Sequence, residues 1–241
     1  MTIEVLPEMR NLWQETLNWH PDDAQQRQFQ QFYELVLTGN RQLNLTRIVE
    51  VQEFWEKHLW DSLRGIFPRV SHPNATLIDI GTGAGFPGVP IAIAAPAWRV
   101  TLLDSTRKKI NFLQDSIEAL NLENAQTLID RVEQTGQTSR YRERFDFATI
   151  RAVASASICA EYALPLLKIN GSAILYRGQW TPEEATLLTE AIEQLGGKLE
   201  AIDRFETPLT GSVRHCLYIR KIRATPKEFP RAIGVPTQSP L

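Results

Sequence analysis

The chain has 241 residues, of which 43% are hydrophobic and 22% are charged, and its formal net charge is −2. This length suits one large α/β domain with a small appendage. No apolar run approaches 18 residues, which argues against a helical membrane span, and a net charge so near zero argues against a uniformly basic nucleic-acid surface.

Two further features of the sequence bear on where the protein works. The N-terminus lacks the basic and apolar regions of a secretory signal, so we expect a cytoplasmic protein. Cys159 and Cys216 have neither a disulfide pattern nor metal-ligand spacing. We therefore expect buried or incidental thiols, no metal and no membrane association.

The N-terminal part of the chain is predicted to be helical. Residues 22–40 carry one apolar stripe at helical spacing and end at Gly39-Asn40. Residues 51–67 repeat the pattern, and Pro68 then interrupts it. We expect a helical extension over residues 1–72.

A strand–helix alternation follows from residue 75. Strands are predicted at 75–80, 98–104, 125–129, 144–150, 171–178, 199–208 and 212–222. Helices are predicted at 86–96, 105–122, 154–167 and 181–197, with Ser105 as the N-cap of the second and a Thr181–Glu184 capping box on the last. The last two strands are consecutive, which predicts an antiparallel pair. The fold class is therefore α/β, with a doubly wound, mostly parallel sheet over residues 73–222. The Pro-rich residues 223–241 are expected to form an irregular tail.

The first strand runs into a glycine loop, LIDIGTGAGFPGVPIAI, that has two interpretations. Gly81, Gly83 and Gly85 form the G-x-G-x-G of a methyl-donor site, whereas Gly83, Gly85 and Gly88 form the G-x-G-x-x-G of a dinucleotide site. Both use a tight turn that lets a ligand approach the backbone. Both also need an acidic residue after the second strand, where Asp104 stands.

Three features favour the methyl donor, S-adenosylmethionine. Gly81 directly follows the strand, so the turn begins with the earlier frame. Asp79 at the strand end disfavours a pyrophosphate and suits an ammonium and a sulfonium. After the expected antiparallel pair little chain remains, so we expect no second domain that would hold a hydride acceptor. Gly88 is then expected to serve close helix–sheet packing, and a nicotinamide-dependent oxidoreductase remains the alternative.

Loops after the third and fourth predicted strands add candidate site residues. The carboxyl ends of parallel strands form the ligand crevice of such sheets. Val132 and Glu133 lie where they flank an adenine, and Arg151 lies where it faces the methyl group or the acceptor. A solvated loop and a strand cap are the alternatives for Glu133 and Arg151.

One local run of cations is a candidate RNA contact, since the chain as a whole is not basic. Its alternative is a solvated strand edge and tail. The run comprises Arg214, Arg220, Lys221, Arg223, Lys227 and Arg231.

Together the motifs resemble one bacterial family. LIDIGTGAGFPGVPIAIAAP, LLDSTRKKINFL, RVE and RAVAS are similar to the small-subunit ribosomal RNA guanine-N7 methyltransferases (the RsmG or GidB family). LNLTRI, KHLWDSL and the tail TPKEFPRAIGVP resemble that family as well. The match runs from about residue 40 to the C-terminus.

The resemblance implies a class I methyltransferase sheet of seven strands that uses S-adenosylmethionine. It also implies small-subunit rRNA as the partner, possible contact with an assembling ribosomal particle, and no obligate protein partner. The implied cofactor contacts are Gly81, Phe86, Asp104, Ser105, Thr106, Val132, Glu133 and Arg151. The chain departs from the family at Val153, where an aromatic residue is common, and at Arg47, where a small residue is usual.

The implied reaction needs little proton chemistry. Guanine N7 has a free lone pair, so it attacks a sulfonium methyl without a general base. Arg151 is the candidate for orienting donor or guanine, and His58 and Asp61 are of second rank. Arg47 and residues 107–109 are expected to join the cationic run in holding RNA phosphates. A methyltransferase of another RNA or a small molecule, and a non-catalytic RNA-binding module, are the remaining alternatives.

Overall fold

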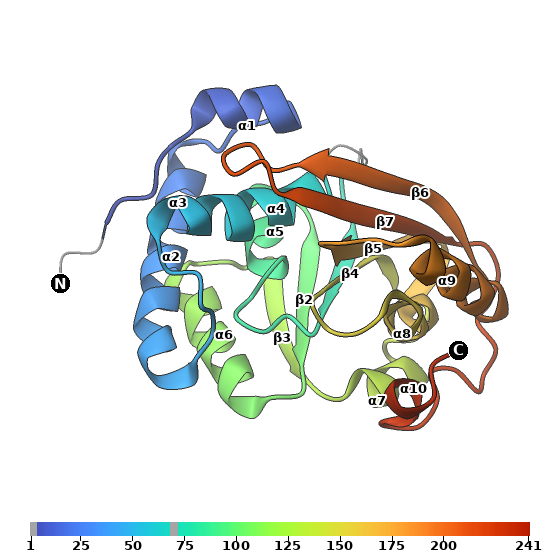
Figure 1. Cartoon of the computed structure of the whole chain (residues 1–241). Coiled ribbons are helices and arrows are strands. Elements are labelled where there is room, and N and C mark those ends of the chain that lie inside the picture. Colours follow the sequence, from blue (N-terminus) through green and yellow to red (C-terminus); the bar gives the residue numbers. More distant parts are fainter. Residues whose placement is uncertain (1–3, 68–71) are drawn as a thin grey trace.

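The computed structural model describes residues 4–67 and 72–241, and its centre is one seven-stranded sheet (Figure 1). The strands are β1 (Thr76–Ile80), β2 (Arg99–Asp104), β3 (Ala125–Ile129), β4 (Phe145–Arg151), β5 (Leu167–Arg177), β6 (Gly197–Glu206) and β7 (Val213–Lys221). Their order is β3-β2-β1-β4-β5-β7-β6. The strands from β3 to β5 pair in parallel, and β7 pairs antiparallel with both β5 and β6. The predicted doubly wound sheet with an antiparallel end is confirmed.

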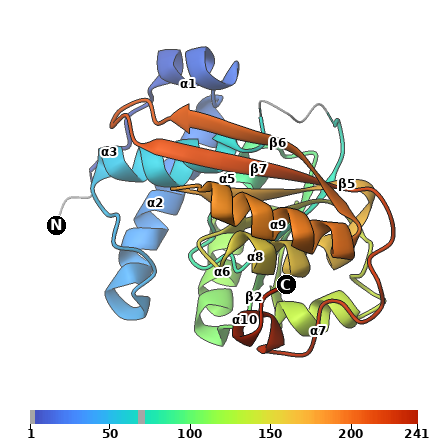
Figure 2. The same ribbon diagram turned by 45° about the vertical axis from the view of Figure 1, so that its right-hand side comes forward.

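Helices cover both faces of the sheet (Figures 1 and 2). One face carries α1 (Arg10–Leu17), α2 (Asp23–Leu43), α3 (Val51–Phe54), α4 (Asp61–Arg64), α5 (Gly88–Ala94) and α6 (Arg107–Ala119). The other carries α7 (Val132–Gln137), α8 (Ala156–Ala163) and α9 (Pro182–Leu195), with the short α10 (Val235–Gln238) against α8. Because successive strand residues point to opposite faces, Leu77 and Leu102 join the first core and Ile78 and Leu103 join the second.

The N-terminal helices share the first core with the sheet. Trp13, Phe29 and Phe54 are buried in the same cluster as Leu77 of β1. Burial in a common core couples the stability of the helices to that of the sheet. Pro68, where the sequence predicts the end of this helical part, lies outside the described residues.

Residues 51–67 form a more complex segment than the single helix that their pattern predicts. A π-helical turn, η1 (Trp55–Trp60), lies between α3 and α4, and the amide of Asp61 donates to the carbonyl of Glu56. Five of the six residues of η1 are buried. A wider turn changes which side chains face inward, and 3.6-residue periodicity does not predict it.

Helix α2 also runs past its predicted end at Gly39-Asn40. It continues to Leu43, and Asn44 closes it in a left-handed conformation. Gly39 is needed for space, because a Cβ there would lie 2.7 Å from the ring of Phe112. Close packing therefore accounts for a glycine that the sequence suggested was a stop signal.

Other predicted boundaries change in three places. Residues 154–167 give α8 and the short 3₁₀ turn η2 (Leu164–Leu166), and β5 already begins at Leu167. Helix α6 begins after Thr106, and no side chain caps it, so Ser105 is not its N-cap. The capping box of α9 and the antiparallel pair of β6 and β7 are confirmed.

Within residues 4–67 and 72–241, none of the helices has both the length and the apolarity that crossing a bilayer requires. Cys159 and Cys216 are both buried and free, as expected. The division of the chain near residues 72 and 222 stays a prediction.

Candidate functional site

The carboxyl ends of five parallel strands lie side by side along one edge of the sheet. In spatial order these ends are Ile129, Asp104, Ile80, Arg151 and Arg177. Two cavities open along this edge. One lies at β3, β2 and β1, and the other lies at β4 and β5. We call them the Gly81 cavity and the Arg151 cavity.

The glycine loop turns tightly because three of its glycines adopt positive φ. These angles are 68° at Gly81, 60° at Gly83 and 101° at Gly85, a region that favours glycine. The amides of Gly81 and Thr82 both donate to the carbonyl of Leu103, at 2.8 and 3.0 Å, which ties the turn to β2. The conformation thus follows the earlier G-x-G-x-G frame.

Gly88 has the packing task that the sequence predicts. It begins α5, and a Cβ there would lie 2.2 Å from Leu102 and 2.8 Å from the carboxylate of Asp79. Asp79 itself is fully buried and accepts from the Gly88 amide and from the Thr149 hydroxyl, both at 2.9 Å. Burial raises the pKa of its carboxyl. Asp79 therefore supports the start of α5, and it is not among the residues that line either cavity.

The Gly81 cavity has a volume of about 360 Å³ and gathers six of the predicted site residues. Asp104 stands at its centre, where its carboxylate accepts from the amides of Gly83, at 3.1 Å, and Thr106, at 2.8 Å. The six residues are Gly81, Asp104, Ser105, Thr106, Val132 and Glu133. Residues that follow the ends of three neighbouring strands thus meet in one cavity.

Val132 and Glu133 belong to a helix rather than to the predicted loop. They begin α7, whose N-cap is Arg131. The run VEQTGQ has little apolar periodicity, so its sequence does not predict a helix. The first turn fixes the Glu133 side chain at the wall of the Gly81 cavity.

Glu133 is buried, and only one of its carboxylate oxygens is used. Oε1 accepts from the Gly234 amide at 3.2 Å and from the Tyr162 hydroxyl at 3.4 Å, and it forms an ion pair with Arg131 at 3.4 Å. Burial and the nearby carboxylate raise the pKa of Tyr162 to about 12. Oε2 is buried without a hydrogen-bond partner. An unsatisfied buried acceptor is costly, so this oxygen suits a donor group of a ligand.

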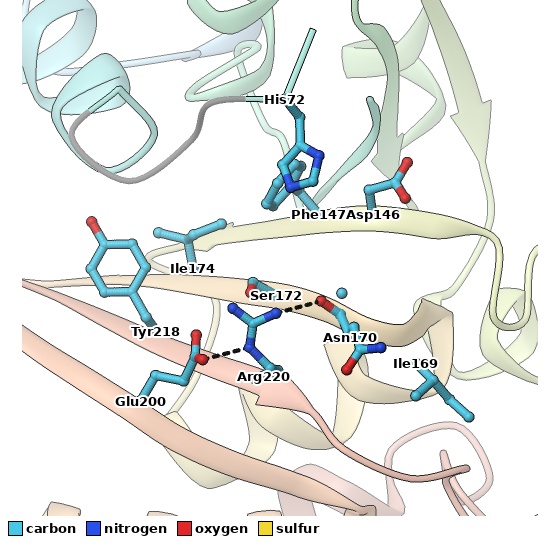
Figure 3. Close-up of a pocket in the computed structure, with 11 residues that line it drawn as sticks. His72, Asp146, Phe147, Ile169, Asn170, Ser172, Ile174, Glu200, Tyr218 and Arg220 are labelled. Atoms are coloured by element: carbon cyan, nitrogen blue, oxygen red, sulfur yellow. Dashed lines mark hydrogen bonds and ion pairs between the residues drawn. The ribbon is translucent and has the colours of Figure 1, made fainter. Parts of the chain in front are cut away.

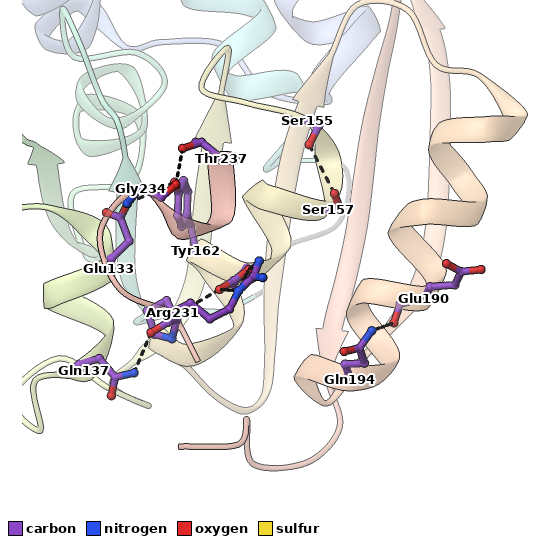
Figure 4. Close-up of polar contacts among 12 residues, drawn as sticks. Glu133, Gln137, Ser155, Ser157, Tyr162, Glu190, Gln194, Arg231, Gly234 and Thr237 are labelled. Carbon is purple, nitrogen blue, oxygen red and sulfur yellow. Dashed lines mark hydrogen bonds and ion pairs between the residues drawn. The ribbon is translucent and has the colours of Figure 1, made fainter. Parts of the chain in front are cut away.

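The C-terminal tail forms part of the same wall (Figure 4). Arg231 binds the buried carboxylate of Glu161 through its backbone amide and its guanidinium, with distances of 2.6 to 3.2 Å. Gly234 contacts Glu133, and Thr237 lines the Gly81 cavity. Sequence reasoning missed this role, because the contacts join residues about 70 and 100 positions apart.

The Arg151 cavity is larger, with a volume of about 880 Å³, and many of its lining side chains are charged. Arg151 donates to the Lys57 carbonyl at 2.9 Å and to the Asp61 carboxylate at 3.3 Å, and its second terminal nitrogen lies 3.4 Å from Nδ1 of His58. The cavity is thus built by β4 and by the segment around η1. The structure brings Arg151, His58 and Asp61 together.

The His58 imidazole is held neutral. Burial, and then the positive charge of Arg151, lower its pKa to about 2. Arg151 is a donor only, so Nδ1 accepts and Nε2–H donates to the Thr46 hydroxyl at 2.8 Å. His58 is therefore a fixed structural partner of Arg151 and is not charged at neutral pH.

Phe86 does not line either cavity. Its ring is 6% exposed and packs against Phe32, Phe54 and His58, with ring centroids 5.2, 5.6 and 4.1 Å apart. The sequence predicts that this side chain lies against the donor, whereas the structure places it in an aromatic cluster behind the glycine loop. Arg151 lies over the same ring, 5.5 Å from its centroid.

The expected cationic run over residues 214–231 requires a correction. Lys221 is fully buried and pairs with Glu143 at 2.8 Å, because β7 lies between β5 and β6 and is not an edge strand. Arg220 pairs with Glu200 and donates to the Asn170 carbonyl (Figure 3). These cations, like Arg231, are already engaged within the fold, so the run as a whole does not form a free basic patch.

A third cavity, of about 610 Å³, surrounds that Arg220–Glu200 pair (Figure 3). It lies at the amino ends of β4 and β5, where Asp146 and Asn170 line it. This is the edge opposite to the two cavities described above. Ligands of doubly wound sheets bind outside the carboxyl ends of the strands. We therefore assign the site to the carboxyl edge, where the Gly81 and Arg151 cavities lie.

Comparison with known proteins gives a consistent match. The family model for rRNA small subunit methyltransferase G matches residues 25–215. A protein of Trichormus variabilis named ribosomal RNA small subunit methyltransferase G is 62% identical, over 98% of this chain and 99% of its own. A protein of the same name from Synechococcus elongatus is 50% identical over the full length of both chains.

Solved structures show the same fold at low sequence identity. TYW2 of M. jannaschii, solved with AdoMet, has a TM-score of 0.55 and 16% identity, over 75% of this chain and 81% of that one. The 16S rRNA (adenine(1408)-N(1))-methyltransferase of Catenulisporales acidiphilia has a TM-score of 0.52 and 17% identity, over 63% of this chain and 87% of that one. The sheet is therefore the class I methyltransferase fold.

Proposed function

Because the chain belongs to the rRNA small subunit methyltransferase G family, we propose that it transfers a methyl group from S-adenosylmethionine to N7 of a guanine in small-subunit ribosomal RNA. The observation that carries this proposal is the pair of cavities along the carboxyl edge of the sheet. The loop over residues 151–154 contributes to both, since Arg151 and Ala152 line one cavity and Val153 and Ala154 line the other. A donor and an acceptor bound in the two cavities meet at this loop.

The residues of the Gly81 cavity fit the proposed cofactor. Asp104 offers carboxylate oxygens to the ribose hydroxyls, and the free Oε2 of Glu133 accepts from the adenine amino group. Gly81 lets the loop over residues 151–154 approach the glycine turn closely, because a Cβ there would lie 2.6 Å from Val153. S-adenosylmethionine supplies an electrophilic methyl group when it is bound.

In this proposal the protein catalyses mainly by positioning. The lone pair of guanine N7 carries no proton, so no side chain has to remove one. Holding two reactants in line contributes on the order of 7–11 kcal/mol. Arg151 orients the guanine, because its guanidinium is fixed by Lys57, Asp61 and His58 at the mouth of the acceptor cavity. The neutral His58 adds no proton step.

The target guanine is expected to be in a loop or to be extruded from its helix. The major groove of A-form RNA, where N7 lies, is too deep and narrow for protein side chains. The phosphates around the extruded base then contact cations near the two cavities. Arg214 lines the Arg151 cavity, and Lys109 lines the Gly81 cavity. Arg47 is exposed and is the neighbour in sequence of Ile48, which also lines the Arg151 cavity.

Three further proposals follow from this function. Because the proposed substrate is ribosomal RNA, we propose that the protein acts in the cytoplasm and that an assembling particle is the form of its substrate. No obligate protein partner is needed for the chemistry described. Helices within residues 10–64 and a sheet over residues 76–221 support the proposed division into an extension over 1–72, a domain over 73–222 and a tail.

Methylation of isolated small subunits tests the function. Subunits from cells that lack the gene, incubated with the purified protein and labelled S-adenosylmethionine, should gain one N7-methylguanosine in mass mapping. The matched variant Glu133→Gln should bind S-adenosylhomocysteine more weakly, because an amide offers one acceptor in place of two. Incorporation at another atom or in no RNA would refute the proposal.

The rival oxidoreductase is tested by calorimetry. We expect the protein to bind S-adenosylhomocysteine and not NADH. A protein that binds NADH alone would belong to the rival class.

A further inference from the structure

We infer that Asp61 recognises the Watson–Crick edge of the target guanine, a role that rests on the methyltransferase function proposed above. The side chain lies in the wall of the Arg151 cavity. It would act as a specificity-determining residue, because it would select guanine among the bases that enter the cavity.

The Asp61 carboxylate is buried and only half satisfied. The residue is 7% exposed, and its Oδ2 accepts one hydrogen bond, from Arg151 at 3.3 Å. Oδ1 accepts none from the described part of the chain. This oxygen keeps contact with solvent, since it is not among the buried polar atoms that lack a partner, and it is therefore open to a donor group of a ligand in the cavity.

The charged groups around Asp61 act in both directions. Burial raises the pKa of its carboxyl, the cations of Arg151 and Arg214 oppose this rise, and the carboxylate of Glu56 adds to it. The other carboxylate of the cavity, Glu184, is already used by Arg177 and by the start of α9. Asp61 is thus the carboxylate of this lining that has an oxygen to offer to a ligand.

Guanine carries the complementary donors. Its N1–H and N2–H₂ lie next to each other on the Watson–Crick edge, and two carboxylate oxygens accept such a pair together. Adenine has an acceptor at N1, so an ionised carboxylate repels it. An extruded guanine has lost its pairing partner, and its donors need new acceptors inside the protein.

The placement of Asp61 also leaves N7 free. N7 lies on the far side of the purine from the N1 and N2 donors. Asp61 begins α4 directly after η1, whereas the loop 151–154 lines both cavities. A guanine held by Asp61 can therefore present N7 towards the loop and the Gly81 cavity.

Inosine at the target position tests this role, because it lacks only the N2 amino group. After mass mapping locates the guanine, ligated small-subunit RNAs with guanosine or inosine there are compared in single-turnover methylation. We expect wild type to prefer guanosine by about tenfold or more, as for a site built to bind a polar group. For Asp61→Asn the ratio should fall to within about twofold of one, since the amide NH₂ opposes the N2 donor.

A matched variant separates recognition from stability. Asp203→Asn breaks an ion pair with Arg64, which lies at the other end of α4 from Asp61, and Asp203 does not line the cavity. It should keep the wild-type ratio. Where a variant methylates RNA too slowly to be measured, the preference for guanosine over inosine is taken from the dissociation constants of the two RNAs, measured with S-adenosylhomocysteine present.

Two results would overturn the role of Asp61 while methylation itself stands: an Asp61→Asn ratio equal to that of wild type, or a wild type that does not distinguish the two RNAs. A wild type that methylates neither RNA would refute the proposed function, and this role with it.

Discussion

The imidazole of His58 lies flat against the ring of Phe86, with centroids 4.1 Å apart and planes 6° apart. This contact joins η1, which builds the Arg151 cavity, to the glycine loop, which builds the Gly81 cavity. The segments that build the two cavities are therefore connected through this packed pair of rings. A change in either ring is expected to act on both sites.

Because His58 stays neutral in the folded protein, we expect the protein to lose stability in acid. Its pKa is about 2 in the fold and 6.5 ordinarily. The unfolded chain binds a proton below pH 6.5 and the folded chain does not, so stability is full above that pH and falls as pH decreases from 6.5 towards 2. The slope is at most roughly 1.4 kcal/mol per pH unit.

Urea unfolding at pH 7.5 and 5.5 checks this slope. The free energy of unfolding of wild type relative to His58→Phe should fall by about 1 kcal/mol. His20→Asn, at an exposed position, is the control. An imidazole ¹⁵N signal of His58 that titrates near pH 6.5 would contradict the prediction.

Phe86→Ala is expected to act first on the fold. Truncating a buried phenylalanine costs about 3–5 kcal/mol, whereas Phe86→Leu fills most of the space. We expect a lower melting temperature for the alanine variant and little change in the affinity of the leucine variant for S-adenosylhomocysteine. The sequence predicts a direct donor contact, and a stable alanine variant with a raised Michaelis constant for S-adenosylmethionine would support that reading.

Arg231→Met is expected to weaken cofactor binding from outside the cavity. Glu161 is 1% exposed and depends on Arg231 for its charge partner, and the tail carries Gly234 to Glu133. A detached tail should weaken S-adenosylhomocysteine binding by about tenfold, or 1.4 kcal/mol. Calorimetry measures the change. Arg223→Met, at an exposed position at the start of the tail, should bind like wild type, and equal affinities of the two variants would reject the link.

The RNA contact is best tested by charge reversal near the Arg151 cavity, and not at Lys221 of the cationic run over residues 214–231. Lys221 is fully buried, so Lys221→Glu would place an uncompensated carboxylate opposite Glu143 and destabilise the fold. Arg47→Glu with Arg214→Glu should instead weaken RNA binding and lower its salt slope by about two. Arg99→Glu, exposed at the amino end of β2, should leave the slope unchanged. A double variant with the wild-type slope would place the RNA elsewhere.

Much of the fold could be predicted because it depends on local patterns. Short apolar runs marked the strands, and the position of Asp104 at the end of one of them placed it at the carboxyl edge. The same reasoning collected six residues that line one cavity. Strand ends and glycine turns depend on residues that are adjacent in the chain, so they can be predicted from a single sequence.

What could not be predicted depends on neighbours that are distant in the chain. Lys221 looks like a surface residue until β6 is known to cover the far side of β7. Phe86 follows the glycines of the donor loop, yet Phe32 and Phe54 decide where its ring packs. Arg231 meets a buried carboxylate on α8, a pairing that no local spacing records.

The π-helical turn Trp55–Trp60 constrains how this protein can change over generations. Such a turn contains one residue more than the α-helical path needs, and each helical residue turns the chain by about 100°. Loss of one residue here would restore a regular helix and rotate Asp61 relative to Phe54 and the residues before it. Surface loops tolerate insertions and deletions, so we expect natural variants to differ in length there, whereas between Phe54 and Asp61 the number of residues should stay constant even where their identities drift.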